Sequence, residues 1–146
     1  MATHVTAVLL ENGENCMFDN MIAHIAKIKD WGPVVVAALD IKAFRLCRNL
    51  MRHENLRDCK LYCASPRKDS SLYWVDKRVS FEDPTYFRIV TLKPALLLAV
   101  LQFGIPCFLT DVDVVFMRSP FPILHSRAYG GSLACSPSDN SHTVHI

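Results

Sequence analysis

The stretch from Pro106 to Phe116 reads PCFLTDVDVVF, an apolar run of strand-forming residues with two carboxylates near its middle. Side chains two residues apart in an extended chain point to the same side, so Asp111 and Asp113 are predicted to share one side of the strand. Like charges held this close repel each other. Such a pair is typical of a site where a cation lies between the carboxylates, or where one carboxylate holds a proton. The alternative is that the strand ends at Thr110 and the two aspartates cap a polar turn.

The rest of the chain alternates between strand-like and helix-like patterns. Further strands are predicted at residues 4–10, 34–39, 60–64 and 131–135. Helices are predicted from the turn at 11–15 to about residue 29, from the cap Asp40 to about residue 53, and from about residue 85 to 103. Pro94 predicts a kink or a fresh start in the third helix. Residues 65–84 are predicted to be a long irregular connection, and loops of that length are often functional.

This order of elements predicts an α/β fold with a doubly wound, mostly parallel sheet. The run at 34–39, VVVAAL, is apolar on both faces, as expected of a strand buried inside such a sheet. Ligands of these sheets bind beyond the carboxyl ends of the strands. Glu11, Asp40, Ser65 and the 111–113 segment all follow predicted strands. The aspartate pair is therefore expected where this architecture places its binding site.

The composition limits the class of protein. The chain has 146 residues, enough for one domain, and a formal net charge of +2, which gives no indication of nucleic acid or of an anionic membrane as a partner. A hydrophobic content of 51% predicts either a sheet covered on both faces or an apolar surface that contacts more protein. The longest apolar run, 95–109, is shorter than the roughly 20 residues that a bilayer requires.

The N-terminus lacks the basic flank and apolar block of a signal peptide. Taken alone this favours the cytosol, although a piece of a larger secretory protein would read the same. With only five glycines and neither G-x-x-x-x-G-K-[ST] nor G-x-G-x-x-G, a glycine-rich phosphate loop is not expected.

Six cysteines are scattered through apolar segments, a pattern that favours free core thiols over a disulfide framework. Two weak zinc patterns are present. Cys59 and Cys63 lie four residues apart but lack a second pair, and Cys135 lies near His142 and His145 in what reads as a flexible tail. Neither pattern predicts a zinc centre.

Two chemistries place D-x-D after a strand. In the first, the carboxylates hold Mn²⁺ or Mg²⁺, which binds the diphosphate of a nucleotide donor. In the second, that of the haloacid-dehalogenase-like hydrolases, Asp111 would be the nucleophile of a phosphatase and Asp113 its acid/base. Residues 108–115 fit the hydrolase pattern too. In those hydrolases, however, the motif normally follows the first strand, whereas here several elements precede it and 33 residues (114–146) follow it.

The surroundings of the pair resemble the nucleotide-diphospho-sugar transferase family, most specifically from Lys93 to Phe121. Lys93 opens a leucine-rich stretch that ends at Gly104, and an apolar strand, D-x-D and then Arg118-Ser119-Pro120 follow. Looser similarity extends over most of the chain, from about residue 5 to 140. It includes the strand closed by Asp40 and the pair Ser138-Asp139.

The resemblance implies a GT-A type, Rossmann-like three-layer sandwich, with residues 1–146 as a single partial domain. It implies transfer of a hexosyl or pentosyl group from a nucleotide-diphosphate donor, most simply a UDP-sugar, to a hydroxyl of a glycan or protein acceptor, in the Golgi or secretory lumen. Carried over by position, Asp111 and Asp113 hold Mn²⁺ or Mg²⁺ and the donor diphosphate. Asp40 contacts the base or ribose, and Lys93 the donor phosphates. No catalytic residue is assigned.

The family usually places its acceptor site and catalytic base after the D-x-D, whereas this chain ends at Ile146. Two functions of different class therefore stay open. One is a metal-dependent glycosyltransferase represented by its donor-binding half. The other is a catalytically inactive product, such as a truncated isoform, a fragment or a pseudoenzyme, that at most binds nucleotide.

Overall fold

The structure, a computed structural model, describes residues 4–11, 15–56, 59–65, 82 and 84–126. In chain order the elements are β1 (Val5–Leu10), α1 (Asn15–Ile25), β2 (Val34–Ala38), α2 (Ile41–Leu50), the 3-10 helix η1 (Glu54–Leu56), β3 (Leu61–Ala64), α3 (Pro84–Leu101), β4 (Cys107–Thr110) and α4 (Phe121–Leu124). The predicted strand at 131–135, the pair Ser138-Asp139 and most of the connection at 65–84 lie outside the described residues.

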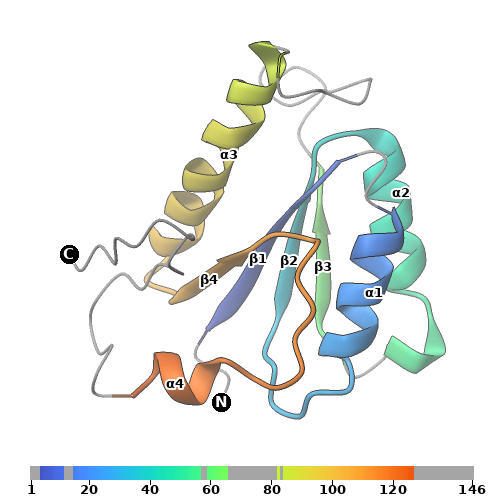
Figure 1. Cartoon of the computed structure of the whole chain (residues 1–146), viewed down its shortest axis with the longest axis vertical. Coiled ribbons are helices and arrows are strands. Elements are labelled where there is room, and N and C mark those ends of the chain that lie inside the picture. The colour runs from blue at the N-terminus through green and yellow to red at the C-terminus, as the bar shows by residue number, and fades with distance from the viewer. Residues whose placement is uncertain (1–3, 12–14, 57–58, 66–81, 83, 127–146) are drawn as a thin grey trace.

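The four strands form one parallel sheet in the order β3-β2-β1-β4 (Figure 1). In the register of the sheet, Leu10 of β1 pairs with Ala38 of β2, and Val8 pairs with Thr110 of β4. The predicted α/β fold with a parallel sheet is thereby confirmed. β2 and β3 extend the sheet on one side of β1, and β4 is added on the other. The direction of winding therefore reverses between β1 and β4.

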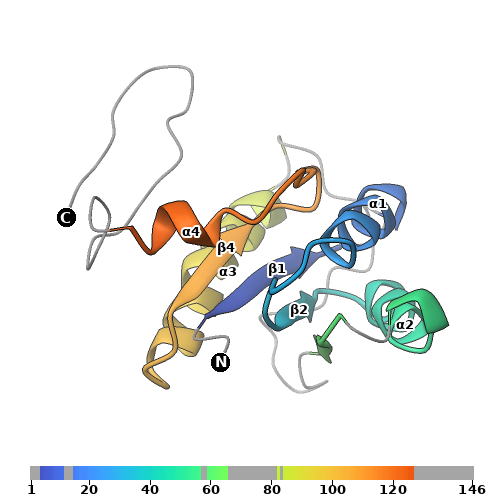
Figure 2. The same cartoon turned by 90° about the horizontal axis from the view of Figure 1, so that it is seen from below.

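The hydrophobic core lies between the strands and the first two helices. In both Figure 1 and Figure 2, α1 and α2 lie on the side of β2 and β3, and α3 lies on the side of β4. The fully buried side chains of the core include Val8, Val34, Val36, Phe18, Met21, Ile22 and Ile25. Trp31, between α1 and β2, is fixed by a buried hydrogen bond of 3.0 Å from its Nε1 to Thr6 Oγ1.

Helix α3 runs without a break from Pro84 to Leu101, with Pro94 inside it. The predicted fresh start is therefore wrong. A proline ring removes one helical hydrogen bond. The residue one turn earlier, Val90, is exposed, and water at such a position can replace the lost partner. Among the described side chains of α3, Leu92 alone is buried, whereas Leu98 is 58% exposed. This apolar helix surface agrees with the predicted excess of exposed apolar residues.

Cys47 of α2 and Cys63 of β3 form a disulfide, with their Cα atoms 6.0 Å apart. The prediction of free core thiols is wrong for this pair, because the packing of α2 against β3 brings together two cysteines that are 16 residues apart in the chain. The disulfide also makes Cys63 unavailable as a zinc ligand together with Cys59. Cys16, Cys59 and Cys107 are free. Cys135, His142 and His145 lie outside the described residues.

Within the described part of the chain, no helix is long and apolar enough to cross a membrane.

Candidate functional site at the carboxyl ends of the strands

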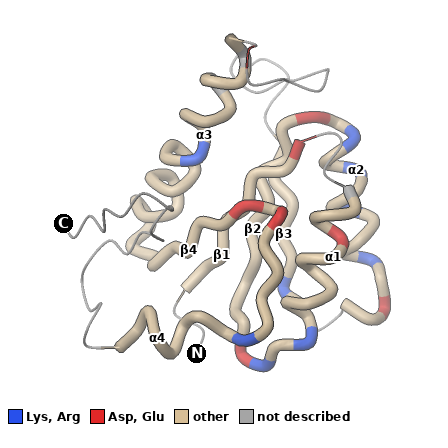
Figure 3. Tube along the Cα trace, in the orientation of Figure 1, with Lys and Arg blue, Asp and Glu red and all other residues tan. Residues whose placement is uncertain are grey.

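The aspartate pair lies where the winding of the sheet reverses. β4 pairs with β1, and its last residue, Thr110, lies beside Val8, so the segment that follows β4 runs past the carboxyl end of β1. In open α/β sheets, ligands bind in the crevice outside the carboxyl ends at such a reversal. Figure 3 shows acidic positions where β4 ends and where α2 begins. The aspartate pair therefore lies at the edge of the sheet where the sequence predicted a binding site, and the binding role itself stays a prediction.

Strand β4 ends at Thr110, and the two aspartates lie on the turn that follows it. The prediction that the pair belongs to the strand is thus wrong, and the alternative, a turn, is what the structure shows. The turn nevertheless keeps the alternation of a strand. Val112 is 4% exposed and packs in the hydrophobic core, whereas Asp111 and Asp113 are exposed on either side of it. Burial of Val112 therefore presents both carboxylates to solvent.

Lys93 and Asp111 form an ion pair between Nζ and Oδ1. Lys93 comes from the middle of α3, which packs against β4. The lysine side chain is 36% exposed and the aspartate side chain 56%, so the pair is open to solvent. Two of the predicted site residues, 18 positions apart in the chain, are thus brought into direct contact. The family resemblance assigned both residues to the donor site, but their direct contact depends on how α3 lies on the sheet.

Asp40 is 4% exposed and caps α2, as predicted. Its Oδ1 accepts hydrogen bonds from the backbone N–H groups of Lys42, at 2.8 Å, and Ala43, at 2.9 Å. Ala38, two residues earlier, pairs with Leu10 at the end of β1. Asp40 therefore lies on the same edge of the sheet as the aspartate pair, with a structural role at the start of α2.

The two exposed carboxylates fit a hard divalent cation that binds together with a diphosphate. Among the residues that the structure describes, no group of three or more His, Cys, Asp or Glu side chains could hold a metal ion. A metal ion at this turn would therefore have two protein carboxylates, Asp111 and Asp113, and would take its other ligands from water or from a bound phosphate group. Mg²⁺ is commonly held by one or two carboxylates, with substrate phosphates among its other ligands, and Mn²⁺ suits the same oxygen atoms. Asp111 already binds a cationic group in the structure, the Lys93 ammonium.

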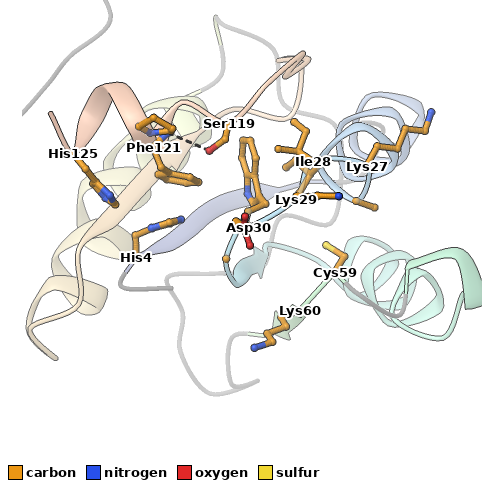
Figure 4. Close-up of a pocket in the computed structure, with 15 residues that line it drawn as sticks. His4, Lys27, Ile28, Lys29, Asp30, Cys59, Lys60, Ser119, Phe121 and His125 are labelled. Atoms are coloured by element: carbon orange, nitrogen blue, oxygen red, sulfur yellow. Dashed lines mark hydrogen bonds between the residues drawn. The ribbon is translucent and has the colours of Figure 1, made fainter. Parts of the chain in front are cut away.

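A cavity of about 810 Å³ lies at the opposite edge of the sheet, before the strands begin (Figure 4). Its lining includes His4, Lys29, Asp30, Gly32 and His125. Sequence reasoning assigned nothing to these residues, which come from separate segments and share no motif. Size alone does not identify a site. The D-x-D turn lies at the carboxyl-end edge of the sheet, away from this cavity.

His4 is buried in the wall of that cavity, with 7% of its surface exposed. Its ring stacks on Phe121, with 3.4 Å between ring centroids, and neither ring nitrogen has a hydrogen-bond partner among the described residues. A Cβ atom on Gly32, whose φ is +54°, would lie 2.9 Å from His4 Nε2, so the glycine makes room for the ring. Burial, and then the nearby His125, lower the pKa of His4.

Comparison with known proteins identifies the family. Residues 32–144 match the family model described as nucleotide-diphospho-sugar transferase. The chain is also similar to beta-arabinofuranosyltransferase RAY1 of Arabidopsis thaliana, with 32% identity over 76 residues. That alignment covers 49% of this chain and 14% of the relative, so the chain spans only a small part of the relative's length. No solved structure matches. Since the family model covers well over half of the chain, the chain belongs to the nucleotide-diphospho-sugar transferase family.

Proposed function

We propose that this chain is the donor-binding part of a metal-dependent glycosyltransferase. The observation that carries the proposal is the turn 111–113, which presents two exposed carboxylates at the reversal point between β1 and β4. Family membership supports a nucleotide-sugar donor. It also favours sugar transfer over the phosphatase chemistry in which Asp111 would be a nucleophile, as does the position of the motif after an edge strand late in the chain.

Each proposed site residue has a role that follows from its position. Asp113 and Asp111 would hold Mn²⁺ or Mg²⁺ with their outward-facing oxygens. When bound there, the metal neutralises charge on the departing nucleoside diphosphate. Lys93, which forms an ion pair with Asp111, would contact the donor phosphates. Asp40, two residues after β2, would contact the base or ribose in addition to capping α2.

Two further observations favour one class of donor sugar and one cellular compartment. The relative is named as an arabinofuranosyltransferase, which favours a pentose donor, for instance a UDP-pentose, over a hexose donor. The disulfide between Cys47 and Cys63 favours an oxidising compartment, in line with the secretory lumen. The acceptor is then a hydroxyl of a glycan or of a protein in that compartment.

A thermal-shift titration tests the donor site. The chain is melted with UDP, with Mn²⁺ and with both, beside Asp113→Ala. At a ligand concentration about a hundred times the Kd, binding to the folded state stabilises it by about 2.7 kcal/mol, which is visible as a rise in Tm. We expect the rise with both ligands together, and its loss in Asp113→Ala. The matched control is Asp19→Ala, an exposed carboxylate on α1. A rise that survives in Asp113→Ala, or no rise in the native chain, would contradict the proposal.

A further inference from the structure

The ion pair between Lys93 and Asp111 places a positive charge on a carboxylate that the proposed function assigns to a metal. The Lys93 ammonium contacts Oδ1 of Asp111, and both side chains remain partly exposed. The contact joins the middle of α3 to the turn that follows β4. In the free protein, the lysine is thus the counter-ion of the candidate metal site.

A divalent cation and an ammonium group on one carboxylate repel each other, because two positive charges a few ångströms apart interact unfavourably. A metal that takes Oδ1 of Asp111, the oxygen that contacts Lys93, displaces the lysine from that oxygen. The displacement carries a cost, which is the free energy of the ion pair. Exposed pairs of this kind contribute up to about fivefold in an equilibrium constant.

A bound nucleotide diphosphate would offer the displaced lysine a new anionic partner. Lysine is a compact charge on a flexible stem and is a common ligand of phosphate groups. The diphosphate bound to the metal would lie beside Asp111, within the region that the Lys93 side chain already reaches. The ammonium can then move from the carboxylate to a phosphate oxygen, so that it loses one anionic partner and gains another.

We propose that Lys93 is an exchangeable counter-ion that couples metal binding to diphosphate binding. The inference rests on the proposed function, since it takes the turn 111–113 as the metal site. In the absence of nucleotide, Lys93 competes with the metal for Asp111. In its presence, Lys93 binds the donor phosphates and the competition ends. Each ligand therefore raises the affinity for the other by the same factor. The pair keeps the carboxylate neutralised until metal and donor are both present.

Lys93→Met tests this coupling, because it removes the charge and keeps most of the apolar stem. Binding of Mn²⁺ alone is measured by the EPR signal of the unbound ion, and binding of UDP at saturating Mn²⁺ by calorimetry. We expect the variant to bind Mn²⁺ alone about two- to fivefold more tightly than the native chain. We expect it to bind UDP at saturating Mn²⁺ about tenfold more weakly or worse, because a charge-assisted hydrogen bond is lost. The matched control is Lys27→Met, at the opposite edge of the sheet, which should change neither affinity.

The two changes of opposite sign distinguish this inference from its alternatives. If Lys93→Met binds Mn²⁺ alone no more tightly than the native chain, the lysine does not compete with the metal and the inference is wrong. If UDP affinity at saturating Mn²⁺ is unchanged in the variant, the lysine does not move to the phosphates and the coupling is again refuted. In both cases, native binding that requires Asp113 would leave the proposed function standing. If the native chain binds neither ligand, the proposed function and the inference fail together.

Discussion

At the scale of single residues, Val112 shows how one buried side chain positions two charged ones. Its burial in the core directs Asp111 and Asp113 outward from the turn. The spacing of two residues predicted that the two carboxylates share one side of a strand, and the structure shows both of them exposed on the turn. The spacing did not predict where the strand ends, because β4 stays paired with β1 only as far as Thr110 and the ladder stops there. Pairing with a neighbouring strand is a tertiary property that the local pattern does not contain.

His4 carries a pH dependence that sequence reasoning missed. Burial and then His125 lower the pKa of His4 from its usual value of 6.5, so the folded state keeps the ring neutral where the unfolded chain already binds a proton. The free energy of unfolding contributed by this residue is therefore present above about pH 6.5 and is lost as the pH falls toward the lowered pKa.

Replacement of the ring tests this assignment. In His4→Phe, which keeps an aromatic ring against Phe121, we expect the free energy of unfolding to fall less between about pH 7.5 and pH 5.5 than in the native chain. The measurement is urea unfolding at the two pH values, with the exposed His53→Phe as control. Equal losses in the native chain and in His4→Phe would show that His4 does not carry the effect.

At the scale of elements, the start of α2 was predicted from its capping residue, whereas the course of α3 depends on its surroundings in the fold. α2 begins after Asp40 as its capping residue indicates. α3 continues through Pro94, where the exposed position one turn earlier, Val90, leaves water able to replace the lost hydrogen bond. The disulfide between α2 and β3 had no signature in the cysteine spacing, since it depends on which helix lies against which strand.

Asp40 offers a prediction that separates its cap from its proposed contact with the donor. In Asp40→Ala, the free energy of unfolding should fall by about 1 kcal/mol, because the N–H groups of Lys42 and Ala43 lose their acceptor. Asp40→Asn retains a capping oxygen and should be nearly as stable as the native chain. Urea unfolding measures both.

The same two variants then test the ligand role. If Asp40 contacts the nucleotide through its charge, Asp40→Asn should weaken UDP binding while stability is preserved. An Asn variant that is as destabilised as the Ala variant would contradict the capping account. An Asn variant with native UDP affinity would restrict Asp40 to a role at the start of α2.

At the scale of the whole molecule, the site is a product of strand order. The alternation of elements predicted a parallel sheet, and the apolar run at 34–39 predicted a strand inside it, which is where β2 lies. The sequence did not reveal that β4 is added beside β1 rather than beside β3, yet this order places the aspartate turn at the reversal of winding. The Lys93 contact depends on the same arrangement, because α3 must lie on the side of β4.

The molecule also has exposed apolar side chains that gather on and just after α3. Phe87 and Leu98 on α3, with Phe103 just beyond it, are largely exposed although they are among the most apolar side chains of the chain. The hydrophobic content predicted either a sheet covered on both faces or an apolar surface of this kind. Its location on α3, at the side of β4, required the structure.

The central claim is that the turn 111–113 holds a metal ion together with a nucleotide diphosphate. The most direct measurement is the anomalous scattering of manganese in crystals of the chain grown with Mn²⁺ and UDP. The account predicts one strong peak within coordination distance of the Asp113 carboxylate, roughly 2 Å, with diphosphate density on its far side. A manganese peak in the cavity beside His4 and His125, or UDP bound with no metal at the turn, would contradict it.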